Sequence, residues 1–495
     1  MKSLESVSPS QQKTTFGRVV EMLLIVMLIL LAIRPSVRWI DAEIFDYDEA
    51  GQFWMAKGLN HYSEPYSPAG NIVDVLVNNR YYNMDPGGFG VILHFWSSFS
   101  NDTIFLRLLP ILFYWGFVLG MFLIGRELLK SVPLAILFAA LATVPQPAEI
   151  FHYLEFPFTA SVGRLRAYTM ELCGVAWSVW YFLHIKDSLS RSHLFRLSLI
   201  MCFFCSSRYG FIIAAFGISI RVLFLILTGM ESIHEKIVRV LFFGLPLLMV
   251  VAIIYLGETK YQNEGIEQLP YYKSIYQNPE MLLSWGTVSI LFVAVCAVIE
   301  KIRNKQVPEF LMLALNITIP FFLLSCIDKY PWGPQGQTPI NPVLLMTEFS
   351  LVFVLLSSLK DKRNWVWGFA LFVTVGLNLF LWTSAIRKKS NAVGTNEIKS
   401  VYNEKVVVCA GMNSVCRYLF EYGPMNDWGY PKRFYFVKGY RHTELLFSTI
   451  GLSDMSKIDL PEYDYALVEP RMGEAVPEGF KMVGKFICER ERKTE

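Results

Sequence analysis

The residues best suited to chemistry are the adjacent carboxylates Asp48 and Glu49, in the segment Phe45–Ala50. This segment follows the first strongly apolar run, at the point where such a run would leave a bilayer on its outer side. A carboxylate held there can accept a proton from a nucleophile as a general base. Acidic residues in exposed loops are often only solvated, however, so the rest of the chain must decide between chemistry at a membrane surface and a solvated loop.

The composition predicts a polytopic membrane protein. Of 495 residues, 53% are hydrophobic, 15% aromatic and only 18% charged, which is too apolar for a soluble globule of this length. Spanning about 30 Å of hydrocarbon takes about 20 apolar residues, and roughly eleven such runs precede residue 385. They begin near residues 19, 104, 131, 167, 192, 208, 238, 281, 307, 340 and 364. The net charge of +3 is small and scattered, with no basic block suited to nucleic acid.

Lys and Arg in alternate connections predict the orientation of these runs, because such clusters mark the cytoplasmic side. The clusters are Arg126 and Lys130; Lys186, Arg191 and Arg196; Lys236 and Arg239; Lys301, Arg303 and Lys305; and Lys360, Lys362 and Arg363. We therefore expect a cytoplasmic tail at 1–18 and a transmembrane module at 19–384. The outer segments are then 34–103, 146–166, 257–280, 327–339 and everything after 385.

Two segments of the outer loop 34–103 are predicted to be interfacial helices. Gln52–Leu59 mixes aromatic residues with Lys57, as an amphipathic helix or a simple anchor resting on the membrane would. Pro86–Phe99 has only about 14 residues and several glycines, too few for a full span. Counting it as a span would also invert every later loop, so we expect it to lie in or dip into the outer interface.

A small extracytoplasmic α/β domain is predicted for 385–495, where the hydropathy falls. A helix is predicted at Ser414–Glu421, between the first two of four strand-like runs: Lys405–Cys409, Arg433–Val437, Tyr465–Val468 and Phe480–Cys488. The segment 410–413 lacks the glycine spacing of a phosphate-binding loop, so no nucleotide site is predicted.

Neither a metal nor another cofactor is implied by the sequence. No Cys/His spacing typical of metal sites occurs, and Glu149 and Glu155 are the only acids of the outer loop between the runs at 131 and 167. Cys409, Cys416 and Cys488 lie in the polar tail, where two of them could form a disulfide whose pairing the sequence does not choose.

Four landmarks in order resemble the N-terminal module of GT-C fold glycosyltransferases that use polyprenyl-phosphate sugars. They are YDEAGQFWMAKG from Tyr47, YYNMDPGGFGVILHFW from Tyr81, FLRLLPILFYWGFVLGMFLIGREL from Phe105 and GRLRAYTMELCGVAWSVWYF from Gly163. The pattern is most similar to protein O-mannosyltransferases and bacterial lipid A aminoarabinose transferases. The later apolar runs and the tail fit that family in layout only.

The resemblance also suggests residue roles. The family has an acidic pair in the first outer loop and an Arg-x-x-Pro at the next span, which correspond to Asp48-Glu49 and Arg107–Pro110. Where the family has His-Pro-Pro or Lys-Pro-Pro, this chain has Met84–Gly87, which leaves that contact to the donor phosphate to Arg80. Lys329 occupies the slot of a late Arg-Tyr in the family.

The chemistry of sugar transfer fits these residue types independently. An inverting transfer needs a base for the acceptor and cations for the departing phosphate. Asp48 is the candidate base and Glu49 is expected to position the acceptor or the loop, although the residues alone do not separate the two. The candidate phosphate ligands are Arg107, Arg80, Arg164 and Lys329, with Arg166 and Arg208 as further cations; each could instead anchor the protein at the lipid headgroups.

Sugar or acceptor contacts are expected from Tyr81, Tyr82, His61 and Tyr153, although an aromatic belt at the interface explains the tyrosines equally well. The resemblance then implies an inverting transfer of a single sugar from a polyprenyl-phosphate carrier to a lipid, protein or glycan acceptor on the non-cytoplasmic face. The membrane is expected to be the bacterial inner membrane, with the endoplasmic reticulum still open.

Three other functions stay open. An envelope polysaccharide polymerase or ligase would use the same kind of donor. A lipid or sugar transporter or flippase would show broken helices or unpaired charges near the bilayer midplane, and inverted repeats, neither of which is clear here. A noncatalytic acidic loop could simply bind a partner.

Overall fold

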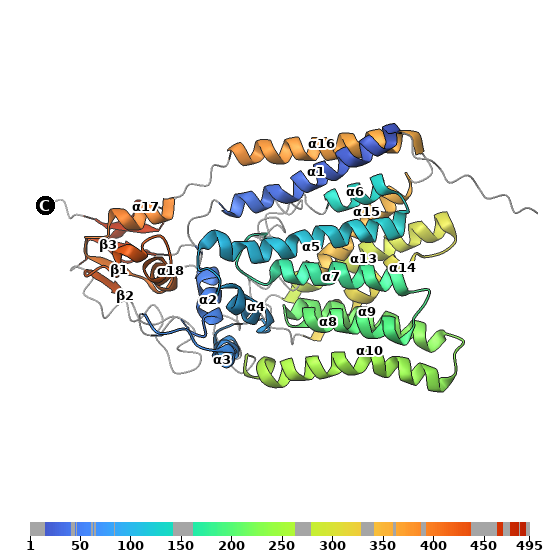
Figure 1. Ribbon diagram of the computed structural model, residues 1–495, viewed down its shortest axis with the longest axis horizontal. Helices are drawn as coiled ribbons and strands as arrows, with labels where there is room; N and C mark the ends of the chain where they lie inside the picture. The colour runs from blue at the N-terminus through green and yellow to red at the C-terminus, as the bar shows by residue number, and fades with distance from the viewer. Residues whose placement is uncertain are drawn as a thin grey trace, which may run out of the picture.

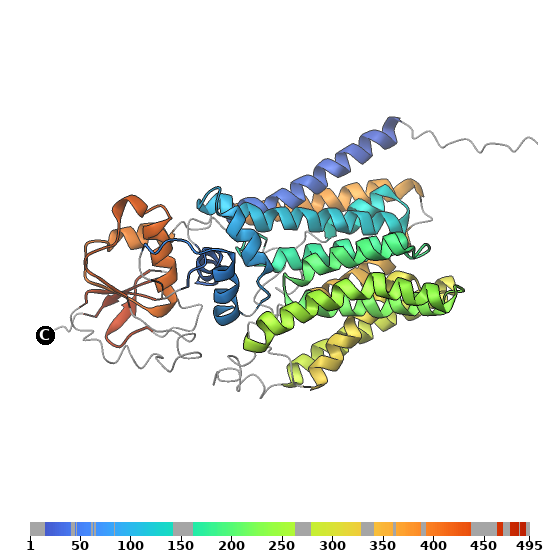
Figure 2. The same ribbon diagram turned by 60° about the horizontal axis from the view of Figure 1, so that its bottom comes forward.

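The computed structural model describes residues 15–40, 45, 47–60, 63, 66–83, 85–141, 162–262, 279–327, 341–359, 363–387, 393–436, 463–468, 476–484 and 486–491. Long helices form a bundle along the longest axis of the molecule, and a small α/β domain lies at one end of it (Figure 1). Three short helices from the first long loop lie between the bundle and this domain, as the turned view in Figure 2 also shows.

A helix occupies each of the apolar runs predicted from the sequence. The bundle consists of α1 (Thr15–Ile40), α5 (Thr103–Leu129), α6 (Val132–Leu141), α7 (Tyr168–Ile185), α8 (Arg191–Cys205), α9 (Tyr209–Thr228), α10 (Ile233–Ile254) with the π-helix η3 (Tyr255–Thr259), α13 (Pro279–Asn304), α14 (Glu309–Ile327), α15 (Asn341–Ser357) and α16 (Arg363–Arg387).

Within the described residues, four helical stretches are long and apolar enough to cross a membrane: Arg18–Val37, Thr103–Leu129, Tyr209–Thr228 and Ile233–Gln262. Ile233–Gln262 is the most exposed of the four, because only 17% of its most apolar window is buried inside the protein. Membrane-spanning helices are thus supported, while the total of about eleven spans stays a prediction.

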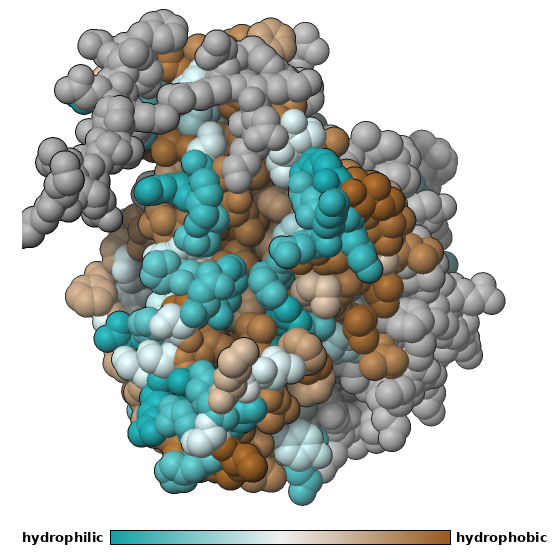
Figure 3. Space-filling view, turned by 90° about the vertical axis from the view of Figure 1, so that its right-hand side faces the viewer, coloured by the Kyte–Doolittle hydropathy of each residue, from teal (hydrophilic) through white to brown (hydrophobic). Residues whose placement is uncertain are grey.

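The described Lys and Arg clusters that predicted the cytoplasmic side share the end of the bundle opposite the α/β domain. There Arg191 pairs with Glu235, Arg239 with Glu231 and Arg303 with Glu300. Figure 3 views this end and shows hydrophilic side chains gathered among apolar ones. These clusters were predicted to lie on one side of the membrane, and their position at one end of the bundle agrees with that. The cytoplasmic orientation of this end stays a prediction.

The first long loop contains α2 (Tyr47–Ala56), α3 (Ile72–Tyr82) and α4 (Gly88–Trp96). The prediction that Gln52–Leu59 rests on the membrane is wrong, because every residue in this segment is buried, and α2 packs against α4 and against α18 (Ala410–Glu421) of the α/β domain. Helix α3 was not predicted; its exposed apolar residues include Val73 and Val77. The short helix predicted within Pro86–Phe99 is confirmed as α4, which is too short to span a bilayer.

The α/β domain contains α17 (Val393–Ser400), β1 (Val406–Val408), α18 (Ala410–Glu421), the 3₁₀ turn η5 (Asn426–Trp428), β2 (Phe434–Phe436), β3 (Tyr465–Leu467), β4 (Phe480–Met482) and β5 (Ile487–Arg490). The sheet order is β2-β1-β3-β5-β4, with β1 parallel to both neighbours and β5 antiparallel to β3 and β4. Each of the first three predicted strand runs contains one strand, whereas the fourth, Phe480–Cys488, contains β4 and the start of the antiparallel β5. The predicted helix is α18. The all-apolar strand β1 is fully buried and lies between β2 and β3.

The three cysteines of the tail are buried, and no disulfide joins any two of them. Cys409 and Cys488 belong to one apolar cluster with Val407, Ala466 and Phe480. They therefore behave as small hydrophobic residues of the domain core. Burial raises the pKa of the Cys488 thiol to about 11, which keeps it protonated at neutral pH.

Gly217 of α9 marks the closest approach between α9 and α14. A Cβ at this position would lie 2.3 Å from the backbone oxygen of Asn316 and 2.6 Å from the Cα of Ile317. We expect Gly217→Ala to lower the stability of the bundle by about 1–3 kcal/mol, because the clash is with backbone and cannot relax by a rotamer change. Thermal unfolding of detergent-solubilised protein measures this loss.

The matched control for Gly217→Ala is Gly244→Ala on α10, where an added Cβ meets nothing within 4 Å. Alanine there is expected to be neutral or slightly stabilising, because it is the better helix former. Equal melting temperatures for the two variants would contradict the α9–α14 packing described here.

Candidate functional site

The carboxylates Asp48 and Glu49 occupy the first turn of α2, where the partial positive charge of a helix N-terminus favours acidic groups. Consecutive residues point about 100° apart around a helix. The two side chains consequently have different surroundings: that of Asp48 is 20% exposed and that of Glu49 only 1%. The sequence does not distinguish the two acids, but in the structure Asp48 is accessible and Glu49 is buried.

Glu49 is held in a buried ion pair with Arg107 of α5. The Arg107 Nε lies 3.3 Å from Glu49 Oε1 and its Nη2 lies 3.1 Å from Oε2. The backbone N–H of Leu165 also donates to Oε1 at 2.9 Å, and the Phe45 ring lies 5.2 Å from the guanidinium. Because the Arg107 side chain is fully buried, this two-point contact fastens α2 to the bundle rather than presenting a cation to solvent.

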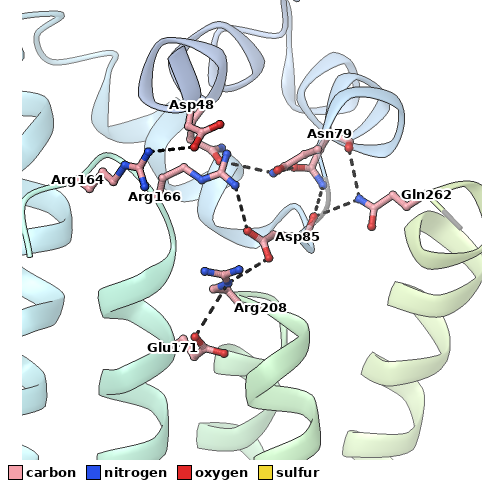
Figure 4. A network of polar contacts seen from close by, with 10 residues as sticks. Asp48, Asn79, Asp85, Arg164, Arg166, Glu171, Arg208 and Gln262 are labelled. Atoms are coloured by element: carbon pink, nitrogen blue, oxygen red, sulfur yellow. Dashed lines mark hydrogen bonds and ion pairs between the residues drawn. The ribbon is translucent and has the colours of Figure 1, made fainter. Parts of the chain in front are cut away.

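Asp48 pairs instead with Arg164, whose Nη2 lies 3.0 Å from Asp48 Oδ2. Arg164 lies in the turn that leads into α7, two residues before Arg166. Figure 4 shows both guanidinium groups beside the Asp48 carboxylate at the end of the bundle. The site therefore combines one partly exposed carboxylate with two arginines on a single short segment.

A second carboxylate, Asp85, links this segment to α9. Its Oδ2 lies 3.5 Å from Arg166 Nη2, and its Oδ1 accepts from Arg208 Nε at 3.1 Å. Arg208 also lies 4.0 Å from the buried Glu171 and stacks on the Tyr168 ring at 4.3 Å (Figure 4). These contacts fix Arg208 between two acids, which suits a structural role.

The turn that carries Asp85 is anchored by its own backbone. The Asp85 carbonyl accepts from Asn79 and Gln262 at 2.9 and 3.2 Å. The Gly87 N–H donates to Glu258 of η3 at 2.7 Å. Gly88 donates to the Ser206 carbonyl at 3.0 Å, where a Cβ would come within 2.7 Å of that oxygen. Glycine at these two positions allows this close approach, and both residues supply N–H donors.

Arg166 remains available for an anion. Its Nε is buried and has no hydrogen-bond partner among the described residues. Burial opposes its charge, but Tyr168 and the carboxylates of Asp48 and Asp85 raise the pKa of Arg166 above its usual value. A charged guanidinium with an unused donor next to a partly exposed carboxylate can bind a phosphate oxygen.

The structure brings only some of the predicted site residues together. Asp48, Glu49, Arg107 and Arg164 form the centre, joined by Arg166 and Arg208. Arg80 stacks on the Tyr261 ring at 4.3 Å and makes no ion pair with Asp48, and the partly exposed Tyr81 lies near the same ring. His61, Tyr153, Lys329 and the side chain of Tyr82 lie outside the described residues.

Sequence reasoning missed Asp85 and Glu171 as members of the site. The signal for Asp85 was the departure of Asp85-Pro86-Gly87 from the His-Pro-Pro or Lys-Pro-Pro of the family that the sequence resembles. A charged residue, Glu171, inside the apolar run of α7 was the other signal, because such a charge is costly in a membrane unless it is paired.

The described residues contain no group of three or more His, Cys, Asp or Glu side chains that could hold a metal ion.

No protein-family model matches the chain, and no curated protein matches it in sequence. Among solved structures, the chain is similar to the crystal structure of an oligosaccharyltransferase from Archaeoglobus fulgidus in complex with Zn and sulfate. The two are 12% identical with a TM-score of 0.40, and the match covers 80% of this chain and 61% of the archaeal one. This chain thus spans less than two thirds of that protein, and the function has to be inferred from the site itself.

Proposed function

We propose that this protein is a GT-C type membrane glycosyltransferase that moves a single sugar from a polyprenyl-phosphate carrier to an acceptor at the non-cytoplasmic surface. The observation that carries the proposal is the arrangement of Asp48, Arg164 and Arg166 at one end of an apolar helix bundle. A base and two cations, at the level where a lipid phosphate would lie, match what this reaction requires.

In the proposed reaction, the acceptor nucleophile loses its proton to a carboxylate oxygen of Asp48. The acceptor atom forms a bond to the anomeric carbon while the bond from that carbon to the phosphate oxygen breaks. The leaving polyprenyl phosphate keeps the electron pair, and Arg164 and Arg166 stabilise its growing negative charge. Attack from the face opposite the phosphate inverts the anomeric centre.

The roles of the two acids follow from their burial. Asp48 is the base because it is the accessible one, and its contact with Arg164 fixes the position of its carboxylate. Glu49 positions α2 through Arg107, so Arg107 supports the site without binding the donor. Since the donor arrives within the bilayer, the proposed location is the bacterial inner membrane with the site facing outward.

The proposal predicts that Arg164→Ala lowers kcat/KM for the donor by about 10- to 100-fold, because a hydrogen bond between charged groups contributes about 1.5–3 kcal/mol. The assay follows radiolabelled sugar from a panel of polyprenyl-phosphate donors into membrane extract with purified protein. Arg191→Ala, which removes an exposed arginine at the opposite end of the bundle, serves as the matched control. Equal transfer by the two variants would remove Arg164 from the proposed site.

A further inference from the structure

The α/β domain contacts the helix that carries the two carboxylates. Helix α18 packs against α2, and Trp54 Nε1 of α2 donates to the Ser414 carbonyl of α18 at 3.1 Å. Arg417 of α18 stacks over the Trp54 ring at 4.5 Å. Figures 1 and 2 show α18 on the side of the domain that faces α2. One face of α2 is therefore covered by a domain encoded at the other end of the chain.

Tyr418 of α18 is the centre of this contact, and it is fully buried. Its ring lies 4.4 Å from that of Phe45 and 5.0 Å from that of Phe53. Its hydroxyl donates to the Asn101 carbonyl at 2.9 Å and lies 3.0 Å from Thr103 Oγ1. One side chain of the α/β domain thus contacts both flanks of the site: the entry to α2 and the start of α5.

Contacts continue from Tyr418 to the acidic pair. Phe45 packs between the Tyr418 ring and the guanidinium of Arg107, and Arg107 holds Glu49. Arg107 lies one turn of α5 after Thr103, to which Tyr418 is hydrogen-bonded. Because α2 has only ten residues, it is too short to be stable alone, and its orientation depends on these contacts.

We propose that Tyr418 is a positioning residue of the transferase site, so that the α/β domain completes the site instead of being an appended module. This inference rests on the proposed function for its effect on catalysis. Tyr418 acts through Phe45 and Arg107 on the direction in which α2 presents Asp48, and it contacts neither of the reactants.

The test compares Tyr418→Ala and Tyr418→Phe with Tyr402→Phe. Tyr402 packs against Trp428 and Phe434 inside the same domain and is the matched control. Amide hydrogen exchange of residues 47–56 reports the order of α2 without any assay of activity. We expect much faster exchange there in Tyr418→Ala, a small increase in Tyr418→Phe, and exchange equal to wild type in Tyr402→Phe.

Transfer kinetics supply the second readout. We expect kcat to fall at least about 10-fold in Tyr418→Ala with the KM for the donor little changed, because Asp48 is misdirected while the arginines remain. Tyr418→Phe keeps the ring and should lose less, about fivefold, for the missing hydroxyl contacts. If Tyr418→Ala does not fold, the variants Tyr418→Phe and Thr103→Val are compared instead, because each removes one hydroxyl of the contact between Tyr418 and Thr103.

The outcomes separate this inference from the proposed function. Unchanged exchange of 47–56 in Tyr418→Ala, or kinetics equal to wild type, would overturn the role of Tyr418. Absence of transfer by the wild type would refute the proposed function, while faster exchange in Tyr418→Ala would still support the contact between the domain and α2.

Discussion

Asp48→Asn is expected to lower transfer by about 10²- to 10⁴-fold, the usual contribution of a general base. The amide cannot take the acceptor proton, but it has the shape of the carboxylate and keeps an oxygen that accepts from Arg164. The fold and the binding of the donor should therefore be nearly unchanged. The measurement is the rate of sugar transfer from polyprenyl-phosphate donors, with thermal unfolding of the same preparation as a check on folding.

The control for Asp48→Asn is Asp187→Asn, at a side chain that is 86% exposed in the loop between α7 and α8. It makes the same chemical change at the opposite end of the bundle, so its transfer rate should equal that of wild type. Full activity in Asp48→Asn would remove the base from the mechanism and favour an acidic loop that only binds a partner.

Arg107→Ala is expected to destabilise the protein by about 3–5 kcal/mol, the usual effect of removing one partner from a buried ion pair. The change leaves the Glu49 carboxylate, whose side chain is 1% exposed, without its bidentate partner. It also removes the surface against which Phe45 packs. Thermal unfolding of the detergent-solubilised protein should show this as a large fall in melting temperature, together with loss of transfer.

A double variant distinguishes the structural role of Arg107 from a role in donor binding. Adding Glu49→Gln to Arg107→Met removes both charges and should recover part of the lost stability, because no buried charge is then left alone. If Arg107→Ala unfolds at the wild-type temperature yet binds donor weakly, Arg107 regains the phosphate-binding role predicted from sequence.

The helices of the bundle could be predicted from the sequence because each depends on a local property, a run of apolar residues. Helix α3 was missed because polar residues such as Asn78, Asn79 and Arg80 interrupt its apolar ones, and its capping box at Asn71 and Asp74 is a weaker local signal. The burial of α2 could not be predicted, because Phe53 and Trp54 look amphipathic until a helix more than 300 residues later covers them.

In the candidate site, too, local features could be predicted and contacts between distant segments could not. The acidic pair was recognisable from residue types and from its position after the first apolar run. Which acid reacts could not be predicted, since adjacent carboxylates differ only in what packs on them, and Arg107 and Leu165 come from other segments. The structural role of Arg107 could not be predicted for the same reason. Its position at the start of an apolar run does not show that it pairs with the buried Glu49.

The hydrogen bond from Trp54 to Ser414 joins residues 360 positions apart in the sequence. This separation determines the order in which the two contacting helices are synthesised and can pack together. Translation completes α2 early, long before α18 leaves the ribosome, and the bundle between them has to be inserted in the meantime. During that interval Phe53 and Trp54 lack the side chains of α18 that pack on them in the folded protein, so their apolar surfaces are open to chaperones or the bilayer. A chain that terminates before α18 would thus lack the residues that cover α2 and Phe45, and its candidate site would be incomplete.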